Sequence, residues 1–213
     1  MTQRLVIAVD GPAAAGKGTL ARRLAQALDL PYLDTGLLYR ATGRRMIDAG
    51  LDPQHAPAET FAASVGLEDL SRTDLRVPEV DRAASLVAAQ PAVRRVLVDV
   101  QRRFAGEHGA VLDGRDIGTV IFPDATVKLF ITASARTRAE RRWEQLASDP
   151  HAPDRAEQVA RVEQEIVARD AADSSRSTAP LRMADDAVRI DTDTLDADEV
   201  LAEALRIVAR MTR

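Results

Sequence analysis

The chain of 213 residues has no cysteine and no asparagine, and only 3% of its residues are aromatic. Without cysteine it cannot contain a disulfide scaffold, a thiolate zinc site or a cysteine nucleophile. The scarcity of aromatic side chains and the net charge of −4 both argue against nucleic-acid binding. The first apolar run, Leu5–Val9, is too short for a signal peptide or a membrane span. These absences predict a cytoplasmic protein with neither a nucleic-acid partner nor a membrane partner.

Lysine is nearly absent as well, because it occurs only at Lys17 and Lys128, and the other permanently charged cations are arginines. We attribute this bias chiefly to coding. In a chain that otherwise uses arginine, a lysine still suggests a position where a compact ammonium group is needed. Lys17 is therefore a candidate functional residue, whereas Lys128 lies inside an apolar run.

Hydrophobic residues make up 46% of the chain, enough for a substantial core. Short apolar runs predict strands at Leu5–Val9, Pro31–Leu33, Val111–Leu112, Val127–Ile131 and Ala187–Asp191. Apolar residues spaced three or four apart predict helices over 20–28, 37–49, 91–104, 135–146, a polar stretch ending near 172, and 200–208. This alternation predicts an α/β fold with a parallel sheet and helices on both of its faces.

The motif Gly-x-x-x-x-Gly-Lys spans Gly11–Lys17, between the first predicted strand and the first predicted helix. In that position backbone N–H groups surround a phosphate, and the helix N-terminus adds its positive end. The lysine reaches the β- and γ-phosphates of a nucleotide. Gly18 follows the lysine and the hydroxyl comes one position later, at Thr19, so the sequence identifies no direct protein ligand for Mg²⁺. The variant Gly-Lys-Gly-Thr resembles the nucleoside monophosphate kinases.

Three further clusters combine charge with glycine or with a helix boundary: Asp34–Arg40, Asp113–Val120 and Arg169–Ser177. Each also has a plain structural interpretation, as a helix cap, a turn and a solvated helix face respectively. An Arg-Asp pair flanked by glycines after a strand nevertheless lies where α/β folds bind ligands.

Taken together and in this order, the motifs resemble the cytidylate kinase family over Ile7 to Leu181. The most specific parts are Gly-Pro-x-x-x-Gly-Lys-Gly-Thr, Asp-Thr-Gly-x-x-Tyr-Arg, Asp-Gly-Arg-Asp-Ile-Gly-Thr-Val-x-Phe-Pro-Asp-Ala and Arg-Asp-x-x-Asp-Ser-x-Arg. Ala83-Ala84-Ser85, followed by Pro91–Arg94, also resembles the region that recognises the base in this family.

The resemblance implies a P-loop NTPase-type fold that transfers the γ-phosphoryl group of ATP, with Mg²⁺, to CMP or dCMP. The implied donor-binding residues are Gly11, Pro12, Ala13, Ala14, Ala15, Gly16, Lys17, Gly18 and Thr19. The implied acceptor-binding residues are Thr35, Gly36, Tyr39, Arg40, Ser85, Arg94, Arg115, Asp116, Arg169, Asp173 and Arg176. Among these, Lys17, Arg40, Arg115 and Arg176 are implied to be catalytic, because they would hold the acceptor phosphate and the transferring group. Ser85, Arg94 and Asp116 would bind the cytosine edge, and Arg169 and Asp173 the sugar hydroxyls.

We also expect one domain over 1–213, acting as a monomer without an obligate protein partner. Its core would comprise 1–50, 83–147 and 181–213. The family often carries a small β-sheet over the acceptor, and the excursion at 51–82 is too short and too rich in alanine for a full version. Residues 148–180 would form a lid, mobile without ligand and starting near Arg138, Arg141 and Arg142. Asp113 would orient a water bound to Mg²⁺.

Two other classes remain for comparison. A regulatory GTPase reads guanine with an Asn-Lys-x-Asp loop, which a chain without asparagine cannot supply. Another P-loop kinase, acting on UMP, AMP, dTMP or a non-nucleotide metabolite such as shikimate or dephospho-coenzyme A, is the nearer alternative. The non-nucleotide kinases do not explain Ser85, Arg94 and Arg115-Asp116 together.

Overall fold

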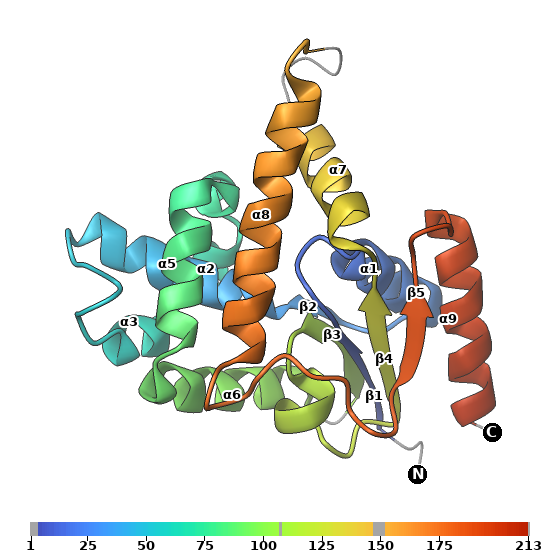
Figure 1. Ribbon diagram of the computed structural model, residues 1–213. Helices are drawn as coiled ribbons and strands as arrows, with labels where there is room; N and C mark the ends of the chain where they lie inside the picture. The colour runs from blue at the N-terminus through green and yellow to red at the C-terminus, as the bar shows by residue number, and fades with distance from the viewer. Residues whose placement is uncertain (1–3, 107, 147–151, 213) are drawn as a thin grey trace. The chain divides into compact units, whose positions relative to one another are not determined.

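The computed structural model describes residues 4–106, 108–146 and 152–212. Five strands form one sheet in the order β2-β3-β1-β4-β5, and β1 pairs in parallel with both β3 and β4, as β4 does with β5. The strands are β1 (Leu5–Asp10), β2 (Tyr32–Asp34), β3 (Gly109–Gly114), β4 (Val127–Thr132) and β5 (Val188–Asp191). The predicted α/β class with a parallel sheet is confirmed, and every predicted strand is present to within three residues (Figure 1).

The helices that the apolar spacing predicts are present, and the structure adds others between them. The helices are α1 (Lys17–Leu28), α2 (Thr35–Asp48), α3 (Glu59–Ala63), α4 (Leu67–Leu70), α5 (Pro78–Ala88), α6 (Pro91–Ala105), α7 (Ala135–Leu146), α8 (Arg155–Ser174) and α9 (Ala197–Met211). Two shorter elements are a 3₁₀-helix, η1 (Thr73–Arg76), and a π-helical turn, η2 (Ile117–Ile121). The apolar spacing does not predict α3, α4, α5, η1 or η2.

The chain divides into two compact units. Unit 1 comprises Met1–Tyr32 and His108–Arg213, and unit 2 comprises Leu33–Glu107. Unit 2 starts before the predicted excursion at 51–82 and ends after it, because α2 and α6 belong with the short helices. The single kinase domain stays a prediction, and each unit is described by itself below.

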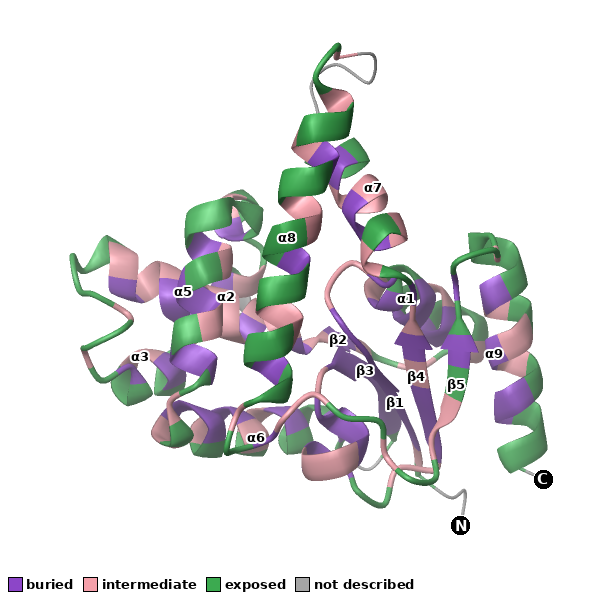
Figure 2. Cartoon of the chain, viewed as in Figure 1, coloured by how far each residue is buried: buried purple, intermediate pink, exposed green. Residues whose placement is uncertain are grey.

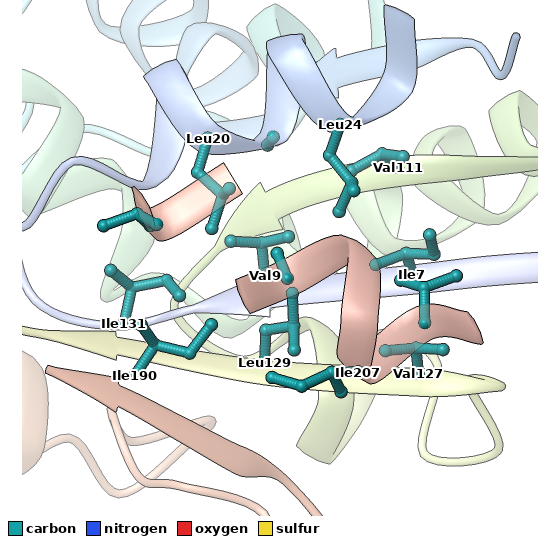
Figure 3. Packing of buried hydrophobic residues seen from close by; sticks show 14 of the residues in the cluster. Ile7, Val9, Leu20, Leu24, Val111, Val127, Leu129, Ile131, Ile190 and Ile207 are labelled. Carbon is teal, nitrogen blue, oxygen red and sulfur yellow. The ribbon is translucent and has the colours of Figure 1, made fainter. Parts of the chain in front are cut away.

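The core of unit 1 is aliphatic and lies between the sheet and two helices. Ile7 and Val9 of β1 pack with Leu20 and Leu24 of α1 and with Ile207 of α9 (Figure 3). Buried residues dominate the three central strands (Figure 2). Each such side chain contributes about 1.5–3 kcal/mol when it leaves water. Because successive side chains of a strand point to opposite faces, Asp10 lies on the face opposite Val9.

Unit 2 is built around the contact between α2 and α5. A Cβ atom at Gly43 would lie 2.9 Å from the Cβ of Ala83, so the two helices approach at a distance that only glycine permits at this position. Residues 51–77 contain short helices and no strand. Arg45 and Asp69 form a two-pronged ion pair that fixes α4 to α2. This hydrogen bonding holds the pKa of Asp69 below its usual range.

Candidate active site

The loop between β1 and α1 has the backbone geometry of a phosphate cradle. Gly11 and Gly16 have φ angles of 146° and 89°, and Ala14, although not a glycine, has a φ of 59°. A side chain at Gly11 would collide with the carbonyl oxygen of Ile131 on β4. Residues in this conformation turn successive N–H groups to one side, and α1 adds its N-terminus. A non-glycine residue at positive φ stores strain, which is common where a backbone shape serves binding.

Lys17 is the first residue of α1 and is only 5% exposed. Its Nζ atom donates a hydrogen bond to the carbonyl oxygen of Pro12 at 2.6 Å, across the loop. This hydrogen bond holds the ammonium group against the backbone of the loop. Thr19, on the first turn of the same helix, is exposed.

Two side chains from outside the loop fix its backbone. Arg138 of α7 donates to the carbonyl oxygens of Ala133 and Ala13, at 3.0 and 3.2 Å. Thr192, buried after β5, donates to the carbonyl oxygen of Ala15 at 3.3 Å and accepts a bond from Arg141 at 2.9 Å. Of the arginines predicted at the start of a lid, Arg138 therefore contacts the phosphate loop directly and Arg141 reaches it through Thr192. Thr192 belongs to none of the sequence motifs.

The carboxyl end of β3 reaches the same edge of the sheet as the phosphate loop, because β1 and β3 are parallel neighbours. Asp113 is 7% exposed there and accepts a hydrogen bond from the hydroxyl of Tyr32 at 2.8 Å. A Cβ atom at Gly18 would lie 3.7 Å from Asp113 Oδ2, so this carboxylate borders the start of α1. Ligands of α/β folds bind at this edge.

Arg115 follows Asp113 and meets the end of α8. Its Nε atom donates to Asp173 Oδ2 at 3.1 Å, and Arg176 Nη2 lies 2.6 Å from Asp173 Oδ1. Asp173 is only 2% exposed, and its buried carboxylate binds both guanidinium groups. Two of the predicted catalytic arginines are therefore brought together. Arg169 lies one turn earlier on α8.

Asp170, the residue after Arg169, forms an ion pair with Arg138 Nη2 at 2.7 Å. This ion pair joins α8 to the arginine that holds the phosphate loop.

Residues 147–151 of the predicted lid lie outside the described residues. Within 152–180, α8 continues to Ser174, two residues beyond the predicted end near 172. The backbone N–H of Leu181 also bonds to the carbonyl of Asp173 at 2.9 Å. The mobility of this region stays a prediction.

Asp116 precedes the π-helical turn η2 and is 6% exposed. The turn is held by Asp10, the last residue of β1, whose two carboxylate oxygens accept the N–H groups of Ile117 and Gly118 at 2.8 and 2.7 Å. Burial raises the pKa of Asp10 to about 6, with a contribution from the charge of Asp116, while the two hydrogen bonds and Lys17 oppose that rise. None of the sequence motifs includes Asp10. Its position at the carboxyl end of a central strand was the available signal.

Unit 2 brings together the other predicted acceptor residues. Arg40 Nε on α2 donates to Asp81 Oδ1 on α5 at 2.8 Å, and Ser85 lies one turn after Asp81, with its hydroxyl donating to the Asp81 carbonyl at 3.3 Å. The guanidinium of Arg94 stands 5.6 Å from the centroid of the Tyr39 ring. In each of these pairs, Arg40 with Asp81 and Arg94 with Tyr39, the two residues lie on different helices. The packing of the helices therefore fixes the distance between them.

Thr35 and Gly36 begin α2, and a Cβ at Gly36 would lie 2.9 Å from Arg40 Nη1. Glycine therefore leaves the room that the Arg40 guanidinium occupies. Asp81 was missed by sequence reasoning because α5 itself was not predicted.

The described residues contain no cluster of three or more histidine, cysteine or acidic side chains that could hold a metal ion. Every helix in the same residues is too short or too polar to traverse a bilayer.

Comparison with known proteins gives one consistent result. The chain is 60% identical to a cytidylate kinase of Granulibacter bethesdensis over 208 residues, covering 97% of this chain and 98% of that one. It is 55% identical over 213 residues to a cytidylate kinase of Acidiphilium cryptum, covering 99% and 98%. A solved gluconokinase from Sinorhizobium meliloti 1021 aligns over 98% of this chain and 94% of that one, with a TM-score of 0.53 and 15% identity, which supports the fold alone. The family described as cytidylate kinase matches residues 7–210, and the chain therefore belongs to the cytidylate kinase family.

Proposed function

We propose that this enzyme transfers the γ-phosphoryl group of ATP to CMP or dCMP, giving ADP and CDP or dCDP, through the residues assembled above. The observation that carries the proposal is at the carboxyl edge of the sheet in unit 1. The phosphate loop follows β1, and Arg115 follows the neighbouring strand β3, with Arg176 held beside it by Asp173. This edge combines an anion cradle with permanently charged, bidentate groups.

The reaction requires little covalent participation by the protein. An ionised oxygen of the CMP phosphate attacks the γ-phosphorus, and the bond from that phosphorus to the bridging oxygen breaks, so that ADP leaves. The acceptor oxygen already carries its charge, and no general base is needed. The enzyme contributes alignment and neutralisation of charge, which arginine forks and a lysine supply.

We assign the donor phosphates to the loop Gly11–Thr19, with Lys17 on the β- and γ-phosphates. The acceptor phosphate is assigned to Arg40, Arg115 and Arg176. The Arg40–Asp81 pair supports this assignment, because Asp81 fixes the guanidinium through Nε and leaves both terminal nitrogens for an anion.

The cytosine edge is assigned to Ser85, Arg94 and Asp116, which together offer a hydroxyl, a donor fork and an acceptor. The sugar hydroxyls are assigned to Arg169 and Asp173. A carboxylate can accept about four hydrogen bonds, so the two arginines on Asp173 leave capacity for a hydroxyl. Thr35, Gly36 and Tyr39 complete the acceptor set from α2.

Mg²⁺ is part of the proposal and would neutralise charge on the phosphates of ATP. The chain fits a cation held mainly by phosphates and water, because Asp113 is the carboxylate that borders Gly18 and the phosphate loop. Asp113, oriented by the Tyr32 hydroxyl, would accept a hydrogen bond from a water in the cation's shell.

We also propose that the enzyme is cytoplasmic and acts as a monomer. The monomer is supported by the fact that one chain supplies every residue assigned above. Light scattering after size-exclusion chromatography should give the chain mass of 23.1 kDa. A dimer mass at assay concentration would contradict the monomer.

The decisive test of the reaction is ADP release measured in parallel with CMP, dCMP, UMP, AMP, dTMP and shikimate as acceptors. CMP and dCMP should be good acceptors, UMP a poor one, and AMP, dTMP and shikimate close to inactive, because a wrong base leaves a polar group of the site without a partner. Turnover of AMP as fast as that of CMP would overturn the assignment.

A further inference from the structure

Asp10 stands where two functional segments meet. It is the last residue of the central strand β1, and the phosphate loop starts at the next residue, Gly11. Its side chain points to the opposite face from Val9, where both carboxylate oxygens are occupied by the N–H groups of Ile117 and Gly118. These two N–H groups directly follow Asp116.

The turn η2 is confined on its other sides as well. The carbonyl oxygen of Asp116 accepts the N–H groups of Val120 and Ile121, at 2.9 and 3.2 Å, which closes the π-helical turn. A Cβ atom at Gly118 would lie 3.3 Å from Asp10 Oδ2 and 3.1 Å from the Lys128 side chain. A side chain at Gly118 would therefore press on both Asp10 and Lys128, and glycine lets the turn lie close to these two residues.

Lys128 fixes the far end of the same segment. Its Nζ donates to the carbonyl oxygen of Pro123 at 2.5 Å and to Asp186 Oδ2 at 2.8 Å. Lys128, the second of the two lysines, therefore has a structural role. The segment that follows Asp116 is held at one end by Asp10 of β1 and at the other by Lys128 of β4.

We propose that Asp10 is a positioning residue for acceptor-base recognition: it sets the place of Asp116 relative to the phosphate loop by binding the two N–H groups that follow Asp116. The inference rests on the proposed role of Asp116 at the cytosine edge. Only a carboxylate fits this task, because an amide offers a single acceptor oxygen and would turn its NH₂ group toward one of the two N–H donors.

The raised pKa of Asp10 agrees with a role in binding in addition to a role in holding the turn. A buried carboxylate loses hydration, and Asp10 also lies close enough to Asp116 for their charges to repel, which is why its pKa rises. A group that weakens the fold in this way and lies beside a binding segment is characteristic of functional sites.

The test compares steady-state kinetics of the wild type with Asp10→Asn, Gly118→Ala and Asp116→Ala. In Asp10→Asn, KM for CMP should rise by about tenfold and the kcat/KM ratio of CMP to UMP should fall by about tenfold, as expected for one lost hydrogen bond in a base-reading site. KM for ATP should change by less than about twofold. Gly118→Ala, which displaces the turn without altering the carboxylate, should give the same pattern and covers the case in which Asp10→Asn does not fold.

Val127→Ala serves as the matched control, because it removes buried volume from the neighbouring strand β4 without touching the turn. It should lower stability and leave the CMP to UMP ratio unchanged. The inference is overturned if Asp10→Asn and Gly118→Ala keep the wild-type ratio while Asp116→Ala loses it. It is also overturned if KM for ATP rises as much as KM for CMP. A wild-type enzyme that does not use CMP, or an Asp116→Ala variant with the wild-type ratio, would instead refute the proposed function or the assigned role of Asp116.

Discussion

The guanidinium of Arg176 and the carboxylate of Asp173 form an ion pair of 2.6 Å at the end of α8. The same carboxylate binds Arg115, so its charge orients two arginines that we assign to the acceptor phosphate. In Asp173→Asn, each arginine keeps at most a neutral partner, and charge-assisted hydrogen bonds are worth about 1.5–3 kcal/mol. We expect kcat with CMP to fall by about 10- to 100-fold.

Steady-state kinetics would check this expectation, with Glu165→Gln as control, since Glu165 is an exposed acid on the same helix. The control should keep wild-type kinetics. If Asp173→Asn kept a wild-type kcat, the carboxylate would not be orienting the two arginines.

Lys17 should be required for turnover rather than for folding. Lys17→Ala should reduce kcat by about 10³-fold, the magnitude typical of removing a charge from the site where negative charge develops. Lys17→Arg should also be strongly impaired, because the Nζ atom is buried and bonded to Pro12, leaving no room for a planar guanidinium. Circular dichroism establishes that each variant is folded, and a folded Lys17→Ala enzyme with near-normal turnover contradicts the assignment.

Arg176 should affect the chemical step more than nucleotide binding. Arg176→Ala should lower kcat by at least about 10²-fold, because the group contacts the transferring phosphoryl group only in the assembled complex, while Kd for ATP changes little. Kinetics and equilibrium ATP binding by calorimetry measure the two effects. Arg161→Ala removes an exposed arginine from the same helix and should leave both unchanged. Equal losses in kcat and in ATP affinity would show that Arg176 belongs to the donor site.

Hydrogen exchange tests the predicted lid separately. Residues 152–180 should gain protection when both nucleotides are bound, because binding would order the segment around Arg176. The same protection with and without nucleotides would show that this region does not close.

The parts of the fold that the sequence predicted are those with a strong local signal. Leu5–Val9 is a continuous apolar run and Val127–Ile131 a nearly continuous one, and such runs are typical of strands buried on both faces of a parallel sheet. The phosphate loop was located because its glycines and Lys17 stand at fixed spacing between a strand and a helix. The arginines of the site were found through family motifs, and the structure adds which carboxylate holds each one.

The features that were missed depend on contacts between distant residues. Asp10 lies 107 and 108 positions before the two N–H groups that it binds, and no local pattern reveals such a pair. The helix α5 was missed because its alanine-rich sequence after Pro78 has few large apolar residues to show a period. Asp81, the partner of Arg40, was missed with it. The two short elements α3 and α4 have too few residues for any periodicity to be visible.

Gly43 should control acceptor binding through helix packing. In Gly43→Ala the added methyl group meets Ala83 and the backbone of α5, so α2 and α5 must separate. That separation moves Arg40 away from Asp81 and Ser85, and we expect KM for CMP to rise by about tenfold with KM for ATP unchanged. Leu97→Val is the control, because it loosens buried packing in α6 without widening the contact between α2 and α5. A wild-type KM for CMP in a folded Gly43→Ala enzyme would show that this helix spacing does not set the acceptor site.

Asp10 should make stability fall as pH rises, because burial raises its pKa from 3.8 to about 6. The folded state then binds a proton that the unfolded state has released, so the neutral form contributes stability that is complete below pH 3.8 and lost by the time pH passes 6. The full effect is about 3 kcal/mol, of which about half lies between pH 5 and pH 8. Urea unfolding at pH 5, 6, 7 and 8 should show that the stability of wild type minus that of Asp10→Asn decreases with rising pH. Asp186→Asn is the control, because the hydrogen bond from Lys128 holds the pKa of Asp186 below its usual range. This carboxyl is ionised in both the folded and the unfolded state from pH 5 to pH 8, so the difference for Asp186→Asn should stay constant. A difference for Asp10→Asn that is independent of pH would mean that the Asp10 carboxyl ionises in the folded protein as it does in water.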